Sequence, residues 1–181
     1  MTRLSKWRPR KQIASIHAPA NLRTWLIEPR SITRRMRRIC RGRFRVKLVH
    51  QQRERPFQDE ARALDLRRAQ SALVRQAVLS CGDEPWVYAR TVFPWSALRG
   101  EYRRLAHLGN NPLGVVLFSN RHVRRGPVEF SEIQQGETLH ELAAAALGCQ
   151  PKGAWARRST FLLAGKPILV TELFLPEFVN G

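Results

Sequence analysis

The chain contains 181 residues, with a net charge of +18 at neutral pH and 43% apolar side chains. This length and composition indicate one globular domain with a sizeable core and argue against wholesale disorder. No apolar run approaches the roughly 20 residues that span a bilayer. No continuous apolar segment follows the basic N-terminus, as a secretory signal would require. We therefore expect a cytoplasmic protein.

Local patterns predict short helices and hairpins along the chain. Apolar residues at helical spacing predict helices, alternation predicts strands, and turn residues between two apolar runs predict hairpins. Ser31 is a good N-cap, and Gly148 a good helix end. In chain order we expect helices at 21–28 and 32–39, a strand at 44–50, a polar helix-like stretch at 59–70, paired strands at 72–80 and 85–93, a helix at 96–107, a strand at 128–133, a helix at 137–147 and paired strands at 155–163 and 167–175.

Hairpins of adjacent strands, with helices between and before them, predict an α+β fold built on an antiparallel sheet. We expect a single domain over residues 21–181. Residues 1–20 should form a basic N-terminal arm that is flexible. The sequence contains no internal repeat and no low-complexity linker.

The positive charge is concentrated in the N-terminal third. Residues 1–55 hold 17 lysines and arginines against two acids, whereas the remainder is nearly balanced. Such a surface can bind nucleic acid, an anionic membrane or an acidic partner, steer an anionic substrate, or simply face solvent. Because no nucleic-acid-binding motif accompanies it, we expect no specific nucleic acid. Peripheral association with an anionic membrane remains open.

The cysteines and histidines suggest neither disulfides nor metal. The chain has three cysteines, Cys40, Cys81 and Cys149. The odd number and the lack of CxxC spacing argue against a disulfide framework and a paired-cysteine zinc site. We expect all three to be reduced, buried core residues. The histidines show no ligand spacing, and His140-Glu141 lacks the second histidine of a zincin motif.

Two predicted strands each carry one charged residue among apolar neighbours. On the last strand Glu172 shares a face with apolar side chains, and on the strand at 85–93 Arg90 does the same. An isolated buried charge is costly, so these residues form either a structural ion pair or a small polar site. A pocket with one arginine, one glutamate and apolar walls suits a small aromatic or cyclic carboxylate, because arginine binds carboxylates with two parallel hydrogen bonds.

No phosphate-binding loop, dinucleotide motif or nucleophile elbow occurs in the chain. Any chemistry is therefore expected to need no metal, cofactor or covalent nucleophile. Several blocks do occur in a recognisable order: GDEPW at 82–86, ARTV at 89–92, PLG at 112–114, WARRS at 155–159, GKPIL at 165–169 and TELFLP at 171–176. From about Trp25 to Pro176 their order and spacing resemble the chorismate lyase family.

The resemblance implies a carbon–oxygen lyase that needs no cofactor. Members of the family convert chorismate to 4-hydroxybenzoate and pyruvate, the first committed step to the ubiquinone ring. Their fold implies a six-stranded antiparallel sheet with helical flaps over an internal ligand site. A monomer that is inhibited by its retained product is implied as well. The alternative on the same fold is a non-catalytic effector domain that senses a small aromatic acid.

The resemblance also implies four ligand-contacting positions. Arg90 would hold the ring carboxylate, and Glu172 would bond the ring hydroxyl or accept a proton, so these two are the expected catalytic residues. Leu113 would contribute its backbone, and Ile32 would lie in the N-terminal flap, where a member of the family has methionine. Arg157 and Arg158 could serve a second carboxylate or face solvent. Five of these six positions lie in the sequence blocks above, and Ile32 precedes them.

Overall fold

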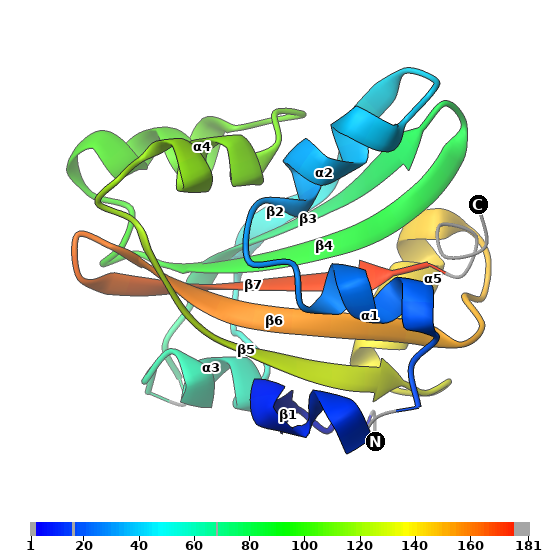
Figure 1. The fold of residues 1–181 in the computed structure, drawn as a ribbon. Coiled ribbons are helices and arrows are strands. Elements are labelled where there is room, and N and C mark those ends of the chain that lie inside the picture. Colours follow the sequence, from blue (N-terminus) through cyan, green and yellow to red (C-terminus); the bar gives the residue numbers. More distant parts are fainter. Residues whose placement is uncertain (1–2, 16, 68, 176–181) are drawn as a thin grey trace.

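The computed structural model describes residues 3–15, 17–67 and 69–175 (Figure 1). Its elements, in chain order, are β1 (Arg8–Pro9), the 3-10 helix η1 (Arg10–Ser15), α1 (Ala20–Leu26), α2 (Ile32–Ile39), β2 (Phe44–Glu54), α3 (Gln58–Ala63), β3 (Ala72–Cys81), β4 (Glu84–Pro94), the 3-10 helix η2 (Gly100–His107), α4 (Leu113–Ser119), β5 (Arg124–Ile133), α5 (Thr138–Leu147), β6 (Ala154–Leu163) and β7 (Lys166–Phe174).

The strands form one antiparallel sheet in the order β1-β5-β6-β7-β4-β3-β2. This confirms the α+β fold with an antiparallel sheet. Six strands were expected, and β2 to β7 account for them. The seventh, β1, consists of two residues from the segment expected to be an N-terminal arm, and it pairs with Phe130 and Glu129 at the edge of the sheet.

Helices cover both faces of the sheet (Figure 1). On one face, here called the front, α1, α2, η2 and α4 pack on the sheet through buried residues such as Leu22, Met36 and Leu117. On the other face, the rear, α3 and α5 cover residues such as Val74 and Leu173. Burial on both faces explains why the central strands read as nearly continuous apolar runs.

The predicted helix ends are largely confirmed. The Ser31 hydroxyl accepts a hydrogen bond from the backbone N–H of Arg34, and Gly148 ends α5 in the left-handed conformation with φ of 71°. The polar stretch at 59–70 forms only the short helix α3, because Asp65 adopts a positive φ of 52° that a helix cannot continue through. The helix expected at 96–107 is the 3-10 helix η2.

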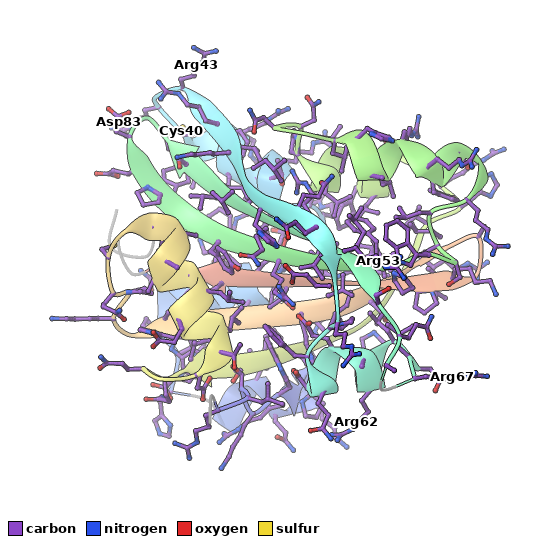
Figure 2. All side chains as sticks on the ribbon, turned by 180° about the vertical axis from the view of Figure 1, so that it is seen from behind. Cys40, Arg43, Arg53, Arg62, Arg67 and Asp83 are labelled. Atoms are coloured by element: carbon purple, nitrogen blue, oxygen red, sulfur yellow. A yellow bond between two sulfur atoms is a disulfide. The ribbon has the colours of Figure 1, made fainter. Side chains whose placement is uncertain are left out.

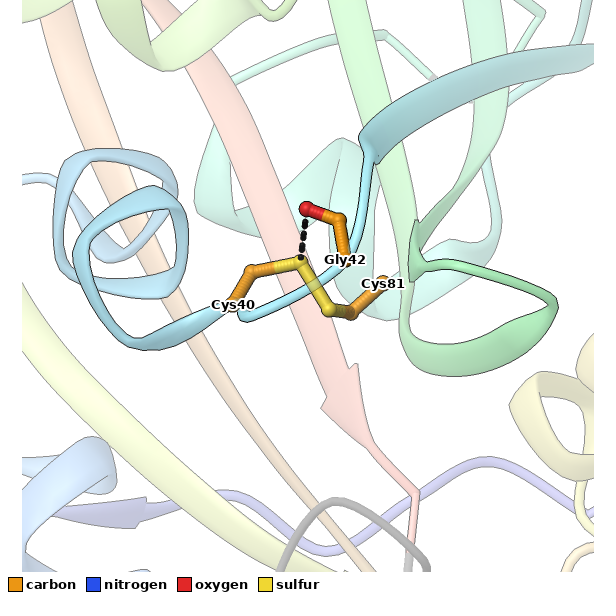
Figure 3. The surroundings of a disulfide bond; sticks show 3 residues. All are labelled: Cys40, Gly42 and Cys81. Atoms are coloured by element: carbon orange, nitrogen blue, oxygen red, sulfur yellow. Dashed lines mark hydrogen bonds between the residues drawn. A yellow bond between two sulfur atoms is a disulfide. The ribbon is translucent and has the colours of Figure 1, made fainter.

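Cys40 and Cys81 form a disulfide, so the expectation of reduced cysteines is wrong for this pair (Figure 3). The two residues are 41 positions apart, and their Cα atoms lie 5.6 Å from each other. Pairing of β2 with β3 places Phe44 opposite Cys81, which brings the end of α2 next to the end of β3. Spacing along the chain cannot reveal this tertiary contact. The third cysteine, Cys149, is a free thiol, but it is exposed rather than buried.

Candidate active site

Arg90 and Glu172 lie on opposite faces of the sheet. In the ladder between β4 and β7, Arg90 is opposite Thr171, whereas Ala89 is opposite Glu172. Directly opposite residues of an antiparallel pair point to the same face. The prediction that Arg90 and Glu172 share a pocket is therefore wrong. The alternation of side chains shows which residues of one strand share a face. Which residues of the neighbouring strand lie on that same face depends on the pairing register.

Arg90 belongs to a structural ion pair on the rear face. Its Nε and Nη2 donate to the two carboxylate oxygens of Glu60, at 2.7 and 3.0 Å, and the arginine is 2% exposed. Burial alone would lower the pKa of Arg90, but the Glu60 carboxylate outweighs it and the pKa is raised. The guanidinium also lies over the Phe57 ring and lines a separate rear hollow of about 340 Å³.

The other three predicted ligand positions line one pocket on the front face. Ile32 and Leu113 are the first residues of α2 and α4, and Glu172 projects from β7 beneath them. The cavity enclosed there measures about 40 Å³. Its remaining walls are largely apolar and include Val46, Leu79, Ala89, Leu117, Phe161 and Val170.

A glycine allows the two helix starts to close over this pocket. A Cβ atom on Gly114 would lie 2.9 Å from the Ser31 hydroxyl oxygen and 3.0 Å from that of Thr33. A residue larger than glycine would displace these hydroxyl groups or push the starts of α2 and α4 apart. The Pro-Leu-Gly turn thus places the start of α4 directly against the start of α2, and both then cover the cavity.

Arg75 is the pocket residue that the sequence interpretation missed. It projects from β3 into the front pocket and is 3% exposed. Its Nη2 donates to the carbonyl oxygens of Gly109 and Asn111, at 2.9 and 3.2 Å, and its Nε has no hydrogen-bond partner among the described residues. The described part of the chain also offers it no carboxylate.

A buried cation without a counter-ion is costly, and burial lowers the pKa of Arg75. A bound carboxylate would relieve this cost and satisfy the free Nε. The signal for Arg75 was present in the sequence, because it too is a charged residue within an apolar strand. The same criterion that selected Arg90 would have selected it.

Glu172 is held by one neighbour. Its Oε2 accepts a hydrogen bond from Arg157 Nε at 2.5 Å, and no other described residue donates to this carboxylate. Its position among Ile168, Val170 and Phe174 on the front face matches the sequence interpretation. One oxygen of the carboxylate thus remains available to a ligand.

Arg157 and Arg158 point to opposite faces, and both are buried. Arg157 lies on the front face beside Glu172. Arg158 lies on the rear face, where it bonds Glu129 and Asp59, each at 2.8 Å. The interpretation that they face solvent is contradicted for both residues.

The sequence matches the family model described as chorismate lyase over residues 1–180. The chain belongs to the chorismate lyase family. A relative from Nitrosomonas eutropha, named "Probable chorismate pyruvate-lyase", is 40% identical over 170 residues, which are 94% of this chain and 93% of that protein. A relative of the same name from Methylococcus capsulatus is 42% identical over 160 residues, 88% of this chain and 97% of that protein.

A solved structure shares the fold of this chorismate lyase family member. The ligand-binding domain of a GntR-family transcriptional regulator from Bordetella bronchiseptica superposes with a TM-score of 0.54 at 17% identity, covering 97% of this chain and 92% of that domain. At this identity the likeness concerns the fold alone. Within the described residues, no helix is long and apolar enough to cross a membrane.

Proposed function

We propose that the protein is a chorismate pyruvate-lyase, which converts chorismate to 4-hydroxybenzoate and pyruvate without a cofactor. The observation that carries this proposal is Arg75, a buried guanidinium with no counter-ion in a pocket that also holds Glu172. Membership of the chorismate lyase family supports it. A cytoplasmic monomer and the role in ubiquinone synthesis are parts of the same proposal.

Arg75, rather than Arg90, anchors the ring carboxylate in this proposal. Arg90 is already paired with Glu60 on the rear face, whereas the Nε of Arg75 has no hydrogen-bond partner among the described residues. Glu172 bonds the ring hydroxyl at the opposite end of the ligand. Ile32 and Leu113 contribute backbone N–H groups, because the first N–H groups of a helix have no acceptor within it.

The reaction draws on a driving force within the substrate. The bond between the ring carbon and the ether oxygen breaks, so that the oxygen leaves with the enolpyruvyl group. The ring carbon that bears the hydroxyl loses its hydrogen as a proton, and the ring becomes aromatic. The proton ends on the departing enolpyruvyl carbon, which gives pyruvate. The protein orients the ring, holds the side chain in a reactive conformer and excludes water. Positioning of this kind can account for about 7–11 kcal/mol of a barrier, and fixed dipoles in a dry pocket add to it.

The closed pocket favours retention of the product. Pockets that hold small molecules measure roughly 300–1,000 Å³, whereas this cavity measures about 40 Å³. One or both of the helices above it must move to admit a ligand and again to release it. We infer that release of 4-hydroxybenzoate is slow and that added product inhibits turnover.

The test is to mix the purified protein with chorismate in excess chelator and to follow 4-hydroxybenzoate and pyruvate together. Formation of both in equal amounts at an enzymatic rate would support a metal-free lyase. Saturable binding of 4-hydroxybenzoate without turnover would instead favour a non-catalytic sensor domain. Absence of both would overturn the proposal.

Replacing Glu172 by glutamine separates its two candidate roles. If the carboxylate only accepts a hydrogen bond from the ring hydroxyl, we expect substantial turnover to remain, because the amide oxygen can accept the same bond. If it accepts a proton during the reaction, kcat should fall roughly 100-fold or more. Single-turnover kinetics at saturating chorismate distinguish the two, and binding of 4-hydroxybenzoate to the variant controls for an intact pocket.

We also propose that the basic surface associates peripherally with anionic membranes. From residue 30 to residue 47 the chain holds nine lysines and arginines and no acid, and most of these side chains are exposed. Figure 2 shows Arg43 of this segment extending away from the sheet. Flotation with vesicles rich in anionic lipid at low salt tests the proposal. No binding there would overturn it, and binding should weaken as salt screens the charges.

A further inference from the structure

One guanidinium joins Glu172 to the start of α2. Arg157 lies directly opposite Glu172 in the ladder between β6 and β7, and its Nε donates to the carboxylate. Its Nη1 donates to the carbonyl oxygens of Trp25 at 3.0 Å and Glu28 at 2.8 Å. These carbonyls belong to the end of α1 and to the segment that leads into α2, residues 27–31, here called the connector.

Arginine side chains donate hydrogen bonds to two carbonyls of the connector, those of Glu28 and Pro29. The last carbonyls of a helix have no partner within it, and Pro29 has no N–H to donate. A second arginine, Arg125, donates through Nη1 to the carbonyls of Glu28 and Pro29, at 3.0 and 3.3 Å, and is itself fixed by Ser159. Burial and the nearby Arg157 lower the pKa of Arg125 to about 10, so it remains charged at neutral pH.

Arg157 does not line the ligand pocket. It is 1% exposed and absent from the cavity wall, although Glu172 and Ile32 are both part of that wall. Its hydrogen bonds reach the carboxylate on one side and the connector on the other. The connector ends at Ser31, and Ser31 and the next residue, Ile32, cover the cavity. The position of Glu172 and the position of the start of α2 therefore depend on the same side chain.

We propose that Arg157 is a positioning residue that fixes Glu172 and the start of α2 in one arrangement, so that the carboxylate and the backbone of the helix act together on the ligand. This inference rests on the proposed function, because it assigns the arrangement to the binding of chorismate. The planar guanidinium suits the role, since it donates in several directions within one plane. A lysine at this position would keep the charge but could not hold both partners.

The test compares Arg157→Lys with Arg158→Lys. The two arginines are adjacent in sequence, buried and paired with carboxylates, but Arg158 faces the rear. We expect Arg157→Lys to lower kcat about 100-fold, the effect of a small misplacement of a reacting group. Arg158→Lys should keep its kcat. Both variants should lose thermal stability, so melting temperature alone cannot explain a difference in kcat.

Hydrogen exchange supplies a readout that needs no turnover. We expect the amides of residues 27–34 to exchange faster in Arg157→Lys than in the parent protein, and at the parental rate in Arg158→Lys. Parental kcat and exchange in Arg157→Lys would overturn the inference, as would an equal loss of kcat in Arg158→Lys. If the parent protein binds 4-hydroxybenzoate but has no activity, the proposed lyase function fails, while the exchange data still decide whether Arg157 fixes the connector.

A second variant covers the case in which Arg157→Lys does not fold. Arg125→Gln removes the second guanidinium that donates to the Glu28 carbonyl and leaves the hydrogen bond between Arg157 and Glu172 in place. We expect faster exchange across the connector and weaker binding of 4-hydroxybenzoate in this variant. Faster exchange with parental binding would overturn the inference, because ligand binding would then not depend on how the connector is held. Parental exchange would support Arg157 as the residue that holds it.

Discussion

Replacing Arg75 by methionine is expected to lower kcat/KM for chorismate by roughly 30- to 5,000-fold, the equivalent of the 2–5 kcal/mol lost when one partner of a buried charge pair is removed. Methionine matches the unbranched arginine stem but offers the ring carboxylate no donor. The bound carboxylate would lie unpaired in an enclosed pocket. Steady-state kinetics and calorimetric titration with 4-hydroxybenzoate measure the loss.

Stability distinguishes this prediction from a general folding defect. Arg75 has no counter-ion among the described residues, so its removal relieves a buried charge while it sacrifices the hydrogen bonds to Gly109 and Asn111. We expect these effects to oppose each other and the melting temperature to stay close to that of the parent protein. A folded Arg75→Met variant with parental kcat/KM would show that the carboxylate is held elsewhere.

Replacing Arg90 by methionine is expected to lower stability and to leave activity unchanged, the opposite of the result expected for Arg75→Met. The loss of Arg90 leaves the Glu60 carboxylate buried without a counter-ion among the described residues, with the Phe57 N–H as its remaining donor, and this costs about 3–5 kcal/mol of stability. For a chain of this size we expect the melting temperature to fall by roughly 6–20 °C. Activity per folded molecule should survive, because Arg90 lies on the face away from the pocket. Thermal denaturation and kinetics at low temperature measure the two effects.

The control for Arg90 removes both charges. The double variant Glu60→Leu with Arg90→Met leaves no uncompensated ion, and replacing a buried pair by apolar residues is often neutral or stabilising. We expect it to recover most of the lost stability. Loss of 4-hydroxybenzoate binding in this folded double variant would contradict the assignment of Arg75 as the anchor and return that role to Arg90.

The fold was predictable because its pairings are local. Most strands pair with a neighbour in sequence, so turn residues such as Gly82 and Gly165 and the apolar runs beside them identify the hairpins. Both hairpins are found where the sequence predicts them. The two-residue strand β1 carries no alternation that could reveal it, and only contact with β5 makes it a strand.

The site was predictable in part. Ile32, Leu113 and Glu172 were expected from the family resemblance, and the structure brings them to one pocket. Arg90 was misplaced because the pairing of β4 with β7 sets which faces match, and no local pattern encodes that register. Arg75 was passed over because its strand was interpreted only as an apolar run.

The disulfide restrains the side of the pocket that α2 covers. Cys40 links the C-terminal end of α2 to β3. Arg125 and Arg157 donate to the Glu28 carbonyl of the connector and hold the N-terminal end, so α2 is fixed at both ends.

The opposite wall, α4, contains no charged residue and no cysteine, and it packs on the sheet through apolar side chains such as Leu117. Arg75 donates to the carbonyls of Gly109 and Asn111 just before α4. No covalent bond ties this helix to the sheet, whereas the disulfide holds α2. We infer that a ligand enters and leaves by displacement of α4 rather than of α2.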